Sequence, residues 1–147
     1  MSALHLALAH HFLAFGLVAI LAYELALVRI GLSGADIARV ARIDAAYGLF
    51  AMLIVAVGIG RVYWGGKGPD YYFANPWFWA KMGAFVLVGL LSILPTMRFF
   101  RWRKALRTTD ALPAPAEIKS VRGVLMAEAV CLASVPLFAA AMARWTG

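Results

Sequence analysis

The chain has 147 residues, of which 64% are hydrophobic and only 14% charged, whereas globular proteins average about 45–50% and about 25%. This composition excludes a water-soluble single domain. The single cysteine, Cys131, excludes a disulfide framework and any cysteine-based zinc or iron–sulfur site. The formal net charge of +7 does not indicate nucleic-acid binding, because the basic residues flank apolar runs, as they do in membrane proteins.

Four apolar runs are long enough to cross a bilayer as helices, at about 4–30, 43–63, 77–100 and 120–143. The first run is longer than the apolar part of a cleaved signal peptide and has no basic segment before it, so we expect it to be retained. Pro95 and Pro136 are expected to kink or end the third and fourth spans. The sequence therefore predicts an all-α fold, a single transmembrane domain over residues 1–147 built as an up-down-up-down four-helix bundle.

The distribution of Lys and Arg predicts the orientation of this bundle. Ten basic residues lie in or beside the first and third connections, and four lie on the other side. Because basic loops stay in the cytoplasm, we expect both termini to be periplasmic in a bacterial inner membrane. Aromatic residues would then form a belt at the outer interface: Tyr63, Trp64, Tyr71, Tyr72, Trp77, Trp79 and Trp145.

Ionisable residues at membrane depth fall into two layers, and each costs about 2.5–3.5 kcal/mol unless it is paired or hydrated. Glu24 lies fourteen residues after His10 and returns within about 40° of the same helix face, but it is nearly opposite His11. If Glu24 faces the bundle interior, His10 does too. The outer layer comprises His5, His10, His11, Arg61 and Lys81, and the inner layer Glu24, Asp44, Arg98, Arg122 and Glu128.

Each of these residues also has a structural interpretation. His10 can hydrogen-bond a carbonyl or a lipid headgroup at the interface, and Lys81, four residues after Trp77, can extend to the outer surface. Glu24 and Glu128 are best explained as partners of cytoplasmic-end arginines, although intramembrane carboxylates also relay protons. The arginines in question are Arg29, Arg98 and Arg122.

The three histidines limit the metal chemistry. They lie within seven residues of one helix, so two of them cannot bind opposite faces of one haem in a monomer. A haem would be five-coordinate, or it would take a second ligand from Met52, Met82, Lys81 or another subunit. No histidine pair has the i, i+4 spacing of a metal site, and no GxSxG, P-loop or GxGxxG motif is present.

Two strings, AHHFLAFG in the first span and NPWFWAKMGAFVLVGLLSILPTMRFFRW in the third, resemble the bacterial predicted-membrane-protein family called domain of unknown function 2214. A more distant resemblance is to the small membrane protoporphyrinogen IX oxidases. That family also has a histidine in span one, a tyrosine thirteen positions later and a Trp-x-x-x-Lys start to span three, here His10, Tyr23, Trp77 and Lys81. The resemblance implies a haem or porphyrin site between spans one and three.

We therefore predict a haem b or porphyrin site in the outer half of the bundle, with a redox role in electron transfer or protoporphyrinogen-like oxidation. His10 is the expected metal ligand, and His11, Arg61 and Lys81 are expected to contact the cofactor. Lys81, Tyr23 and Glu24 are the candidate catalytic residues. A quinone or respiratory-chain protein would be the redox partner, and a bundle this small can form a homo-oligomer. The alternative is a cofactor-free carrier or assembly subunit whose buried charges are structural.

Overall fold

A computed structural model describes residues 2–146, which form five helices and no strand. Four of them are long and apolar enough to cross a membrane, with mean hydropathies of 1.8 to 2.0. The prediction of an all-α bundle with four spans is confirmed. The long helices are α1 (Ala3–Leu27), α2 (Gly34–Trp64), α4 (Pro76–Thr109) and α5 (Pro115–Ala143), and the short one is α3 (Gly68–Ala74).

The helix ends differ from the predicted spans because hydropathy marks only the apolar part of a helix. The second helix begins at Gly34, well before the predicted 43, because Ser33 and Asp36 form a reciprocal capping box there. Helix α4, which contains the third predicted span, continues through its basic segment to Thr109. The next residue, Asp110, adopts a left-handed conformation with φ of 52°. The first helix ends earlier than predicted, at Leu27.

The two intrahelical prolines end neither span. Helix α4 continues for fourteen residues beyond Pro95, and α5 runs past Pro136 to Ala143. Pro95 is fully buried, so it lies on the face of α4 that packs against the other helices. Of the two expected outcomes, a kink or a helix end, the helix end does not occur at either proline, and both are accommodated inside their helices as membrane helices commonly allow.

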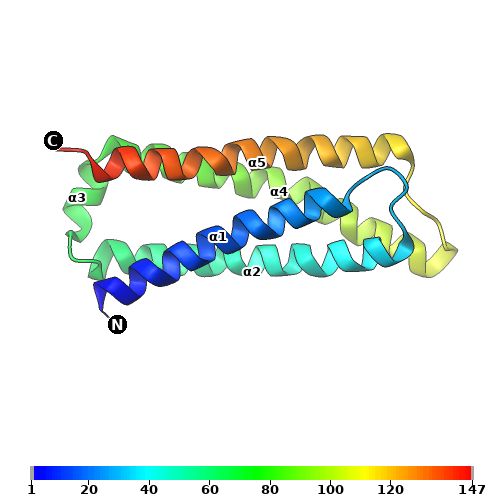
Figure 1. Ribbon diagram of the computed structural model, residues 1–147, viewed down its shortest axis with the longest axis horizontal. Coiled ribbons are helices and arrows are strands. Elements are labelled where there is room, and N and C mark those ends of the chain that lie inside the picture. The colour runs from blue at the N-terminus through cyan, green and yellow to red at the C-terminus, as the bar shows by residue number, and fades with distance from the viewer. Residues whose placement is uncertain (1, 147) are drawn as a thin grey trace.

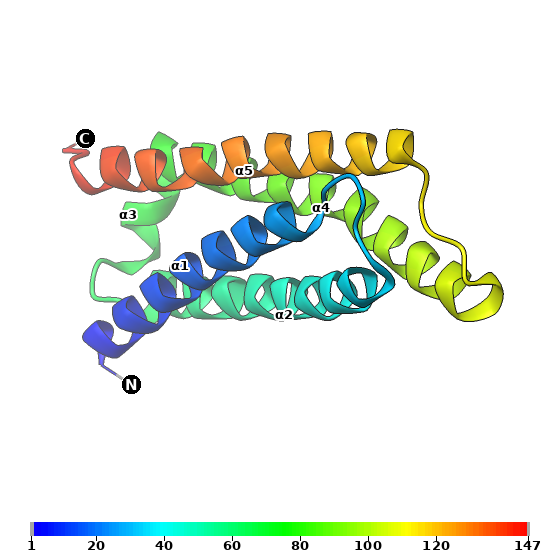
Figure 2. The ribbon, with the colours of Figure 1, turned by 45° about the vertical axis from the view of Figure 1, so that its right-hand side comes forward.

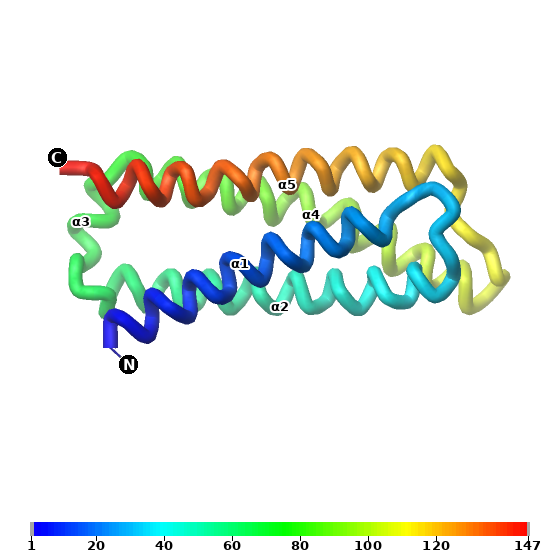
Figure 3. The backbone as a smooth tube through the Cα atoms, in the orientation of Figure 1, coloured from blue at the N-terminus to red at the C-terminus, as the bar shows by residue number. Residues whose placement is uncertain are grey.

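The four long helices form a ring in which α1 packs on α2 and α4 packs on α5, and the two pairs meet through α2–α4 and α1–α5 contacts. In Figure 1 both termini and α3 lie at one end, and the α1–α2 and α4–α5 connections lie at the other. Helices α1 and α4 run obliquely across the bundle, as the turned view of Figure 2 also shows. The tube in Figure 3 traces these two connections, which both lie at the end opposite the termini. The even number of spans thus places both termini on one side.

Most of the interior is a single apolar core that runs through the middle of the bundle and toward the connection end. It contains Leu13, Leu17, Leu21, Ile54, Val88, Phe99, Trp102, Val121, Leu125 and Leu132, among others. The outer faces carry large apolar side chains such as Phe12, Phe15, Met52 and Val130, each at least two-thirds exposed. In water such faces would aggregate, whereas in a bilayer they contact lipid.

Candidate functional site

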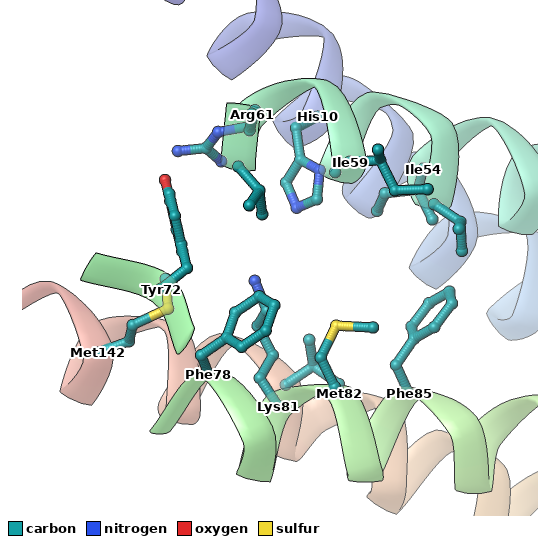
Figure 4. A pocket seen from close by; sticks show the side chains of 14 residues that line it. His10, Ile54, Ile59, Arg61, Tyr72, Phe78, Lys81, Met82, Phe85 and Met142 are labelled. Carbon is teal, nitrogen blue, oxygen red and sulfur yellow. The ribbon is translucent and has the colours of Figure 1, made fainter. Parts of the chain in front are cut away.

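A cavity of about 140 Å³ lies between the α1–α2 pair and the α4–α5 pair, at the end of the bundle that carries α3. All five helices contribute to its walls. The walls are mostly apolar, with Ile54, Ile59, Phe78, Met82 and Phe85 surrounding the space in Figure 4. Three basic side chains enter this apolar space, which makes it the chemically most distinctive place in the described chain: His10, Arg61 and Lys81.

Helix α3 closes the end of the bundle next to this cavity. The Tyr71 hydroxyl donates to the Met142 carbonyl at 2.8 Å, and Asn75 Nδ2 donates to the same carbonyl at 3.1 Å. Asn75 is fully buried, and its Oδ1 also accepts from the Trp77 amide, which caps α4. These bonds fix α3 against α5, so that Tyr72 on α3 turns inward and forms part of the cavity wall.

His10 is the histidine that faces this cavity. Its Nδ1 is buried and has no hydrogen-bond partner among residues 2–146. The other two are satisfied within their own helix, since His5 bonds the Ser2 hydroxyl at 2.7 Å and His11 bonds the Ala7 carbonyl at 2.7 Å. A buried polar atom without a partner is costly in a stable fold and points to a missing partner.

Lys81 and Arg61 extend the positive character of the site. Figure 4 shows the Lys81 amine pointing into the cavity toward His10, from the opposite wall. The ammonium lies 5.9 Å from the centre of the Phe78 ring, which is favourable but weak. Within the described residues neither cation forms a salt bridge, and no carboxylate lines the cavity. The site is therefore suited to a ligand that brings acceptor atoms or negative charge.

Residues 2–147 match the model of a family described as Predicted membrane protein (DUF2214). The chain belongs to this family. No curated protein and no solved structure matches the chain. The family description states a membrane protein and no activity, and the resemblance to the membrane oxidases stays a prediction.

The structure brings together three of the predicted site residues and leaves the others elsewhere. His10, Arg61 and Lys81 line one cavity. His11 lies outside it because neighbours on a helix differ by about 100° in direction, so a cofactor contact from His11 is not supported. Tyr23 is 42% exposed on the outer face of α1 and also lies far from the cavity.

Glu24 is buried, but in a second polar cluster nearer the connection end. The predicted pairing of Glu24 and Glu128 with arginines is wrong. Arg98 instead bonds Glu117, and Arg122 bonds backbone carbonyls at the end of α1. Among residues 2–146 no group of three or more His, Cys, Asp or Glu side chains is placed to hold a metal ion.

Tyr72, Phe78 and Gly58 line the cavity but were not expected there. Tyr72 was assigned to the aromatic belt, because the breaker-rich connection gave no sign of the short helix α3 that turns it inward. The His10 ring lies beside Gly58 of α2, because a Cβ built there would be 3.7 Å from His10 Cε1, an ordinary van der Waals contact. The Gly68-Pro69 start of α3 is the local signal that would have indicated a helix N-terminus.

Proposed function

We propose that this protein binds a carboxylate-bearing tetrapyrrole, haem b or a porphyrin, in the cavity between the two helix pairs. The observation that carries the proposal is the His10 imidazole. It is left without a hydrogen-bond partner in an apolar cavity that also receives two unpaired cations. An imidazole suits iron, and Lys81 and Arg61 suit propionate groups, because ion pairs strengthen where water is excluded.

The size of the cavity determines how such a ligand would be held. Its volume of about 140 Å³ is close to that of a cavity of about 150 Å³ that binds one benzene. The cavity encloses about one ring and is partly open to its surroundings, which leaves the rest of a macrocycle at the side of the bundle. The chain's residues would then hold one edge of the ligand and keep water from it.

A redox role follows from this cofactor class, because a bound haem supplies one-electron chemistry. The imidazole of His10 would hold the iron, Lys81 and Arg61 would neutralise the carboxylates, and the apolar walls would exclude water. An exposed ligand edge suits exchange of electrons with a partner at the side of the bundle. A membrane quinone or a respiratory-chain protein is the partner that we propose.

The second candidate is the quinone itself as the ligand of the cavity. The one-ring volume favours it, since a single quinone ring would be enclosed almost completely. Lys81 and the protonated nitrogen of the His10 ring would donate hydrogen bonds to the two carbonyl oxygens. In this second proposal the site holds a redox-active lipid and no iron.

We further propose that the α3 end of the bundle is periplasmic and that the protein lies in a bacterial inner membrane. Ten of the fourteen Lys and Arg residues lie in or beside the α1–α2 and α4–α5 connections, and these lie together at the opposite end (Figure 3). The excess of basic residues in connecting segments supports a cytoplasmic location for that end.

An absorption spectrum of the detergent-purified protein, oxidised and dithionite-reduced, tests the first proposal. We expect a Soret band that sharpens on reduction after haem is supplied, and its loss in His10→Ala. His5→Ala is the matched control, because His5 is already hydrogen-bonded and lies outside the cavity.

A flat spectrum with added haem, or equal haem retention in the two variants, would overturn the haem assignment. The quinone proposal is tested separately by binding of a short-chain ubiquinone or menaquinone analogue to the haem-free protein. Binding that His10→Ala weakens and His5→Ala does not would support it. If neither haem nor quinone binds, the protein is better described as a cofactor-free carrier or assembly subunit.

A further inference from the structure

A second set of polar groups lies in the half of the bundle nearer the connections. Glu24 comes from α1, Asp44 and Tyr47 come from α2, and Glu128 comes from α5. The exposed fractions are 2% for Glu24, 6% for Asp44, 5% for Tyr47 and 1% for Glu128. Three helices thus place three buried carboxyl groups inside an otherwise apolar core.

Within residues 2–146, no cation forms a salt bridge with these carboxyl groups. Among residues 2–146 the salt bridges are Arg39 with Asp36 and Glu117 with Arg98 and Arg101. Arg122, on the same helix as Glu128, donates from Nη1 to the Leu25 and Val28 carbonyls at 2.6 and 2.8 Å. Arg122 therefore satisfies carbonyls at the C-terminal end of α1 and forms no salt bridge with a carboxylate of the described residues.

The groups that face the cluster leave several polar atoms without partners. From α4, the Thr96 hydroxyl donates to Asp44 Oδ1 at 2.7 Å. Glu24 Oε1, Glu128 Oε1 and the Tyr47 hydroxyl are buried and have no hydrogen-bond partner among residues 2–146. A tyrosine hydroxyl can donate to a carboxylate or accept from a protonated carboxyl group, so Tyr47, buried on α2, can serve either state of an acid in this core.

An ionised carboxylate without a partner is very expensive in a core of low dielectric, and three would also repel one another. A metal ion would relieve this charge, but these side chains are not arranged to coordinate one. A proton needs no coordination shell, and it turns a carboxylate into a group that can donate to its neighbour. The chemistry of the cluster therefore favours protons as its ligand.

We propose that Glu24 and Glu128, with Tyr47 between the helices, form a proton-binding site inside the membrane. Each carboxylate takes up one proton and becomes a neutral carboxylic acid. Asp44, held by Thr96, is the third acid of the site. Glu24 lies within one turn of the end of α1 at Leu27, so the short path for proton exchange leads to the connection end of the bundle.

This site is separate from the His10 cavity. Leu13, Leu17 and Leu21 of α1 lie between the two and are buried, with Leu17 only 1% exposed. The fourteen residues from His10 to Glu24 span about 21 Å of helix. The proposal therefore does not depend on whether the cavity binds haem, quinone or nothing.

Infrared spectroscopy of the full chain in lipid nanodiscs tests the proton-binding proposal. A protonated carboxyl group has a C=O stretching frequency that is well separated from the stretching frequencies of a carboxylate. We expect wild type to show the protonated band at neutral pH and to lose it in alkaline buffer. Glu24→Gln and Glu128→Gln should each lose part of the band, and the double variant most of it. Glu117→Gln is the matched control, because Glu117 already forms a salt bridge with Arg98, and its spectrum should equal that of wild type.

A wild-type spectrum without the band at neutral pH would overturn the proposal, and so would an unchanged band in the double variant. Exchange of K⁺ for Na⁺ at constant pH should leave the band unchanged, whereas its loss in Na⁺ would identify a sodium site instead. Tyr47→Phe retains all three carboxyl groups, so this variant tests the proposal if the Gln variants fail to fold. It should shift the frequency of the band without removing it, and an unshifted band would contradict the role of Tyr47.

Discussion

Substitution of Gly16 by alanine tests how closely α1 and α2 approach each other. A Cβ at this position would lie 2.3 Å from Phe50 Cε1 and 2.7 Å from Phe50 Cδ1. Carbon atoms in favourable contact are about 3.5–4.0 Å apart, so the ring or the helix must move by about 1 Å or more. This crossing lies six residues from His10, and it helps to set how His10 lies against Gly58.

The magnitude follows from a comparison with a glycine in open space. An extra methyl group in a packed interior destabilises by about 1–3 kcal/mol, while replacing a helical glycine by alanine gains up to about 1 kcal/mol. Gly83, on α4, has no atom within 4 Å of its added Cβ, so Gly83→Ala carries only the gain. We expect the free energy of unfolding of Gly16→Ala to be about 1–3 kcal/mol lower than that of Gly83→Ala, which is about 5- to 150-fold in the unfolding equilibrium constant.

Reversible unfolding in mixed dodecylmaltoside and dodecylsulfate micelles, followed by far-ultraviolet circular dichroism, measures this difference. A double variant, Gly16→Ala with Phe50→Leu, removes the ring that the methyl group would meet and should recover part of the loss. Equal stability of Gly16→Ala and Gly83→Ala would refute the close approach. If the double variant is no more stable than the single variant Gly16→Ala, the destabilisation does not come from a steric clash with Phe50.

Three further results are expected. Lys81→Met should weaken binding of the cavity ligand about tenfold, which corresponds to about 1.4 kcal/mol. A titration with haem or with a quinone analogue measures this loss. Lys67→Met, at an exposed lysine, is the control and should bind as wild type does. Arg122→Gln should destabilise the bundle by about 1–3 kcal/mol in micelle unfolding, because it removes the bonds to the Leu25 and Val28 carbonyls; the exposed Lys119→Gln on the same helix should change little. Alkaline phosphatase fused to either terminus should be active if both termini are periplasmic, and cytoplasmic reporter activity would overturn that orientation.

The number of spans was predictable because each helix is apolar over a bilayer's thickness, and this signal does not depend on tertiary contacts. The true starts and ends were not, because they depend on caps and polar extensions. The capping box of Ser33 and Asp36 starts α2 in a polar segment that hydropathy excludes. Helix α3 was missed because seven residues between turn signals carry no periodicity long enough to detect.

Part of the candidate site was also predictable. The angular relation between His10 and Glu24 selected both as inward-facing residues, and the structure places His10 on the cavity and Glu24 in the core. The partners of the inner charges were not predictable from depth alone. Arg122 donates to carbonyls at the end of α1, because that helix end leaves them without donors of its own.

The arrangement of polar groups along the bundle limits how its two candidate sites can communicate. A proton moves along water or along a chain of polar side chains, and the buried residues between His10 and Glu24 are leucines on α1 with Ile54, Val88 and Leu132 facing them from the other helices. Since this layer offers neither route, any coupling between the cavity and the carboxyl cluster requires a movement of the helices. The oblique helices α1 and α4, which cross the bundle from one pair to the other (Figures 1 and 2), are the elements through which such a movement would pass. Without it, effects of His10→Ala and Glu128→Gln on stability should add, as they do for distant sites without shared partners.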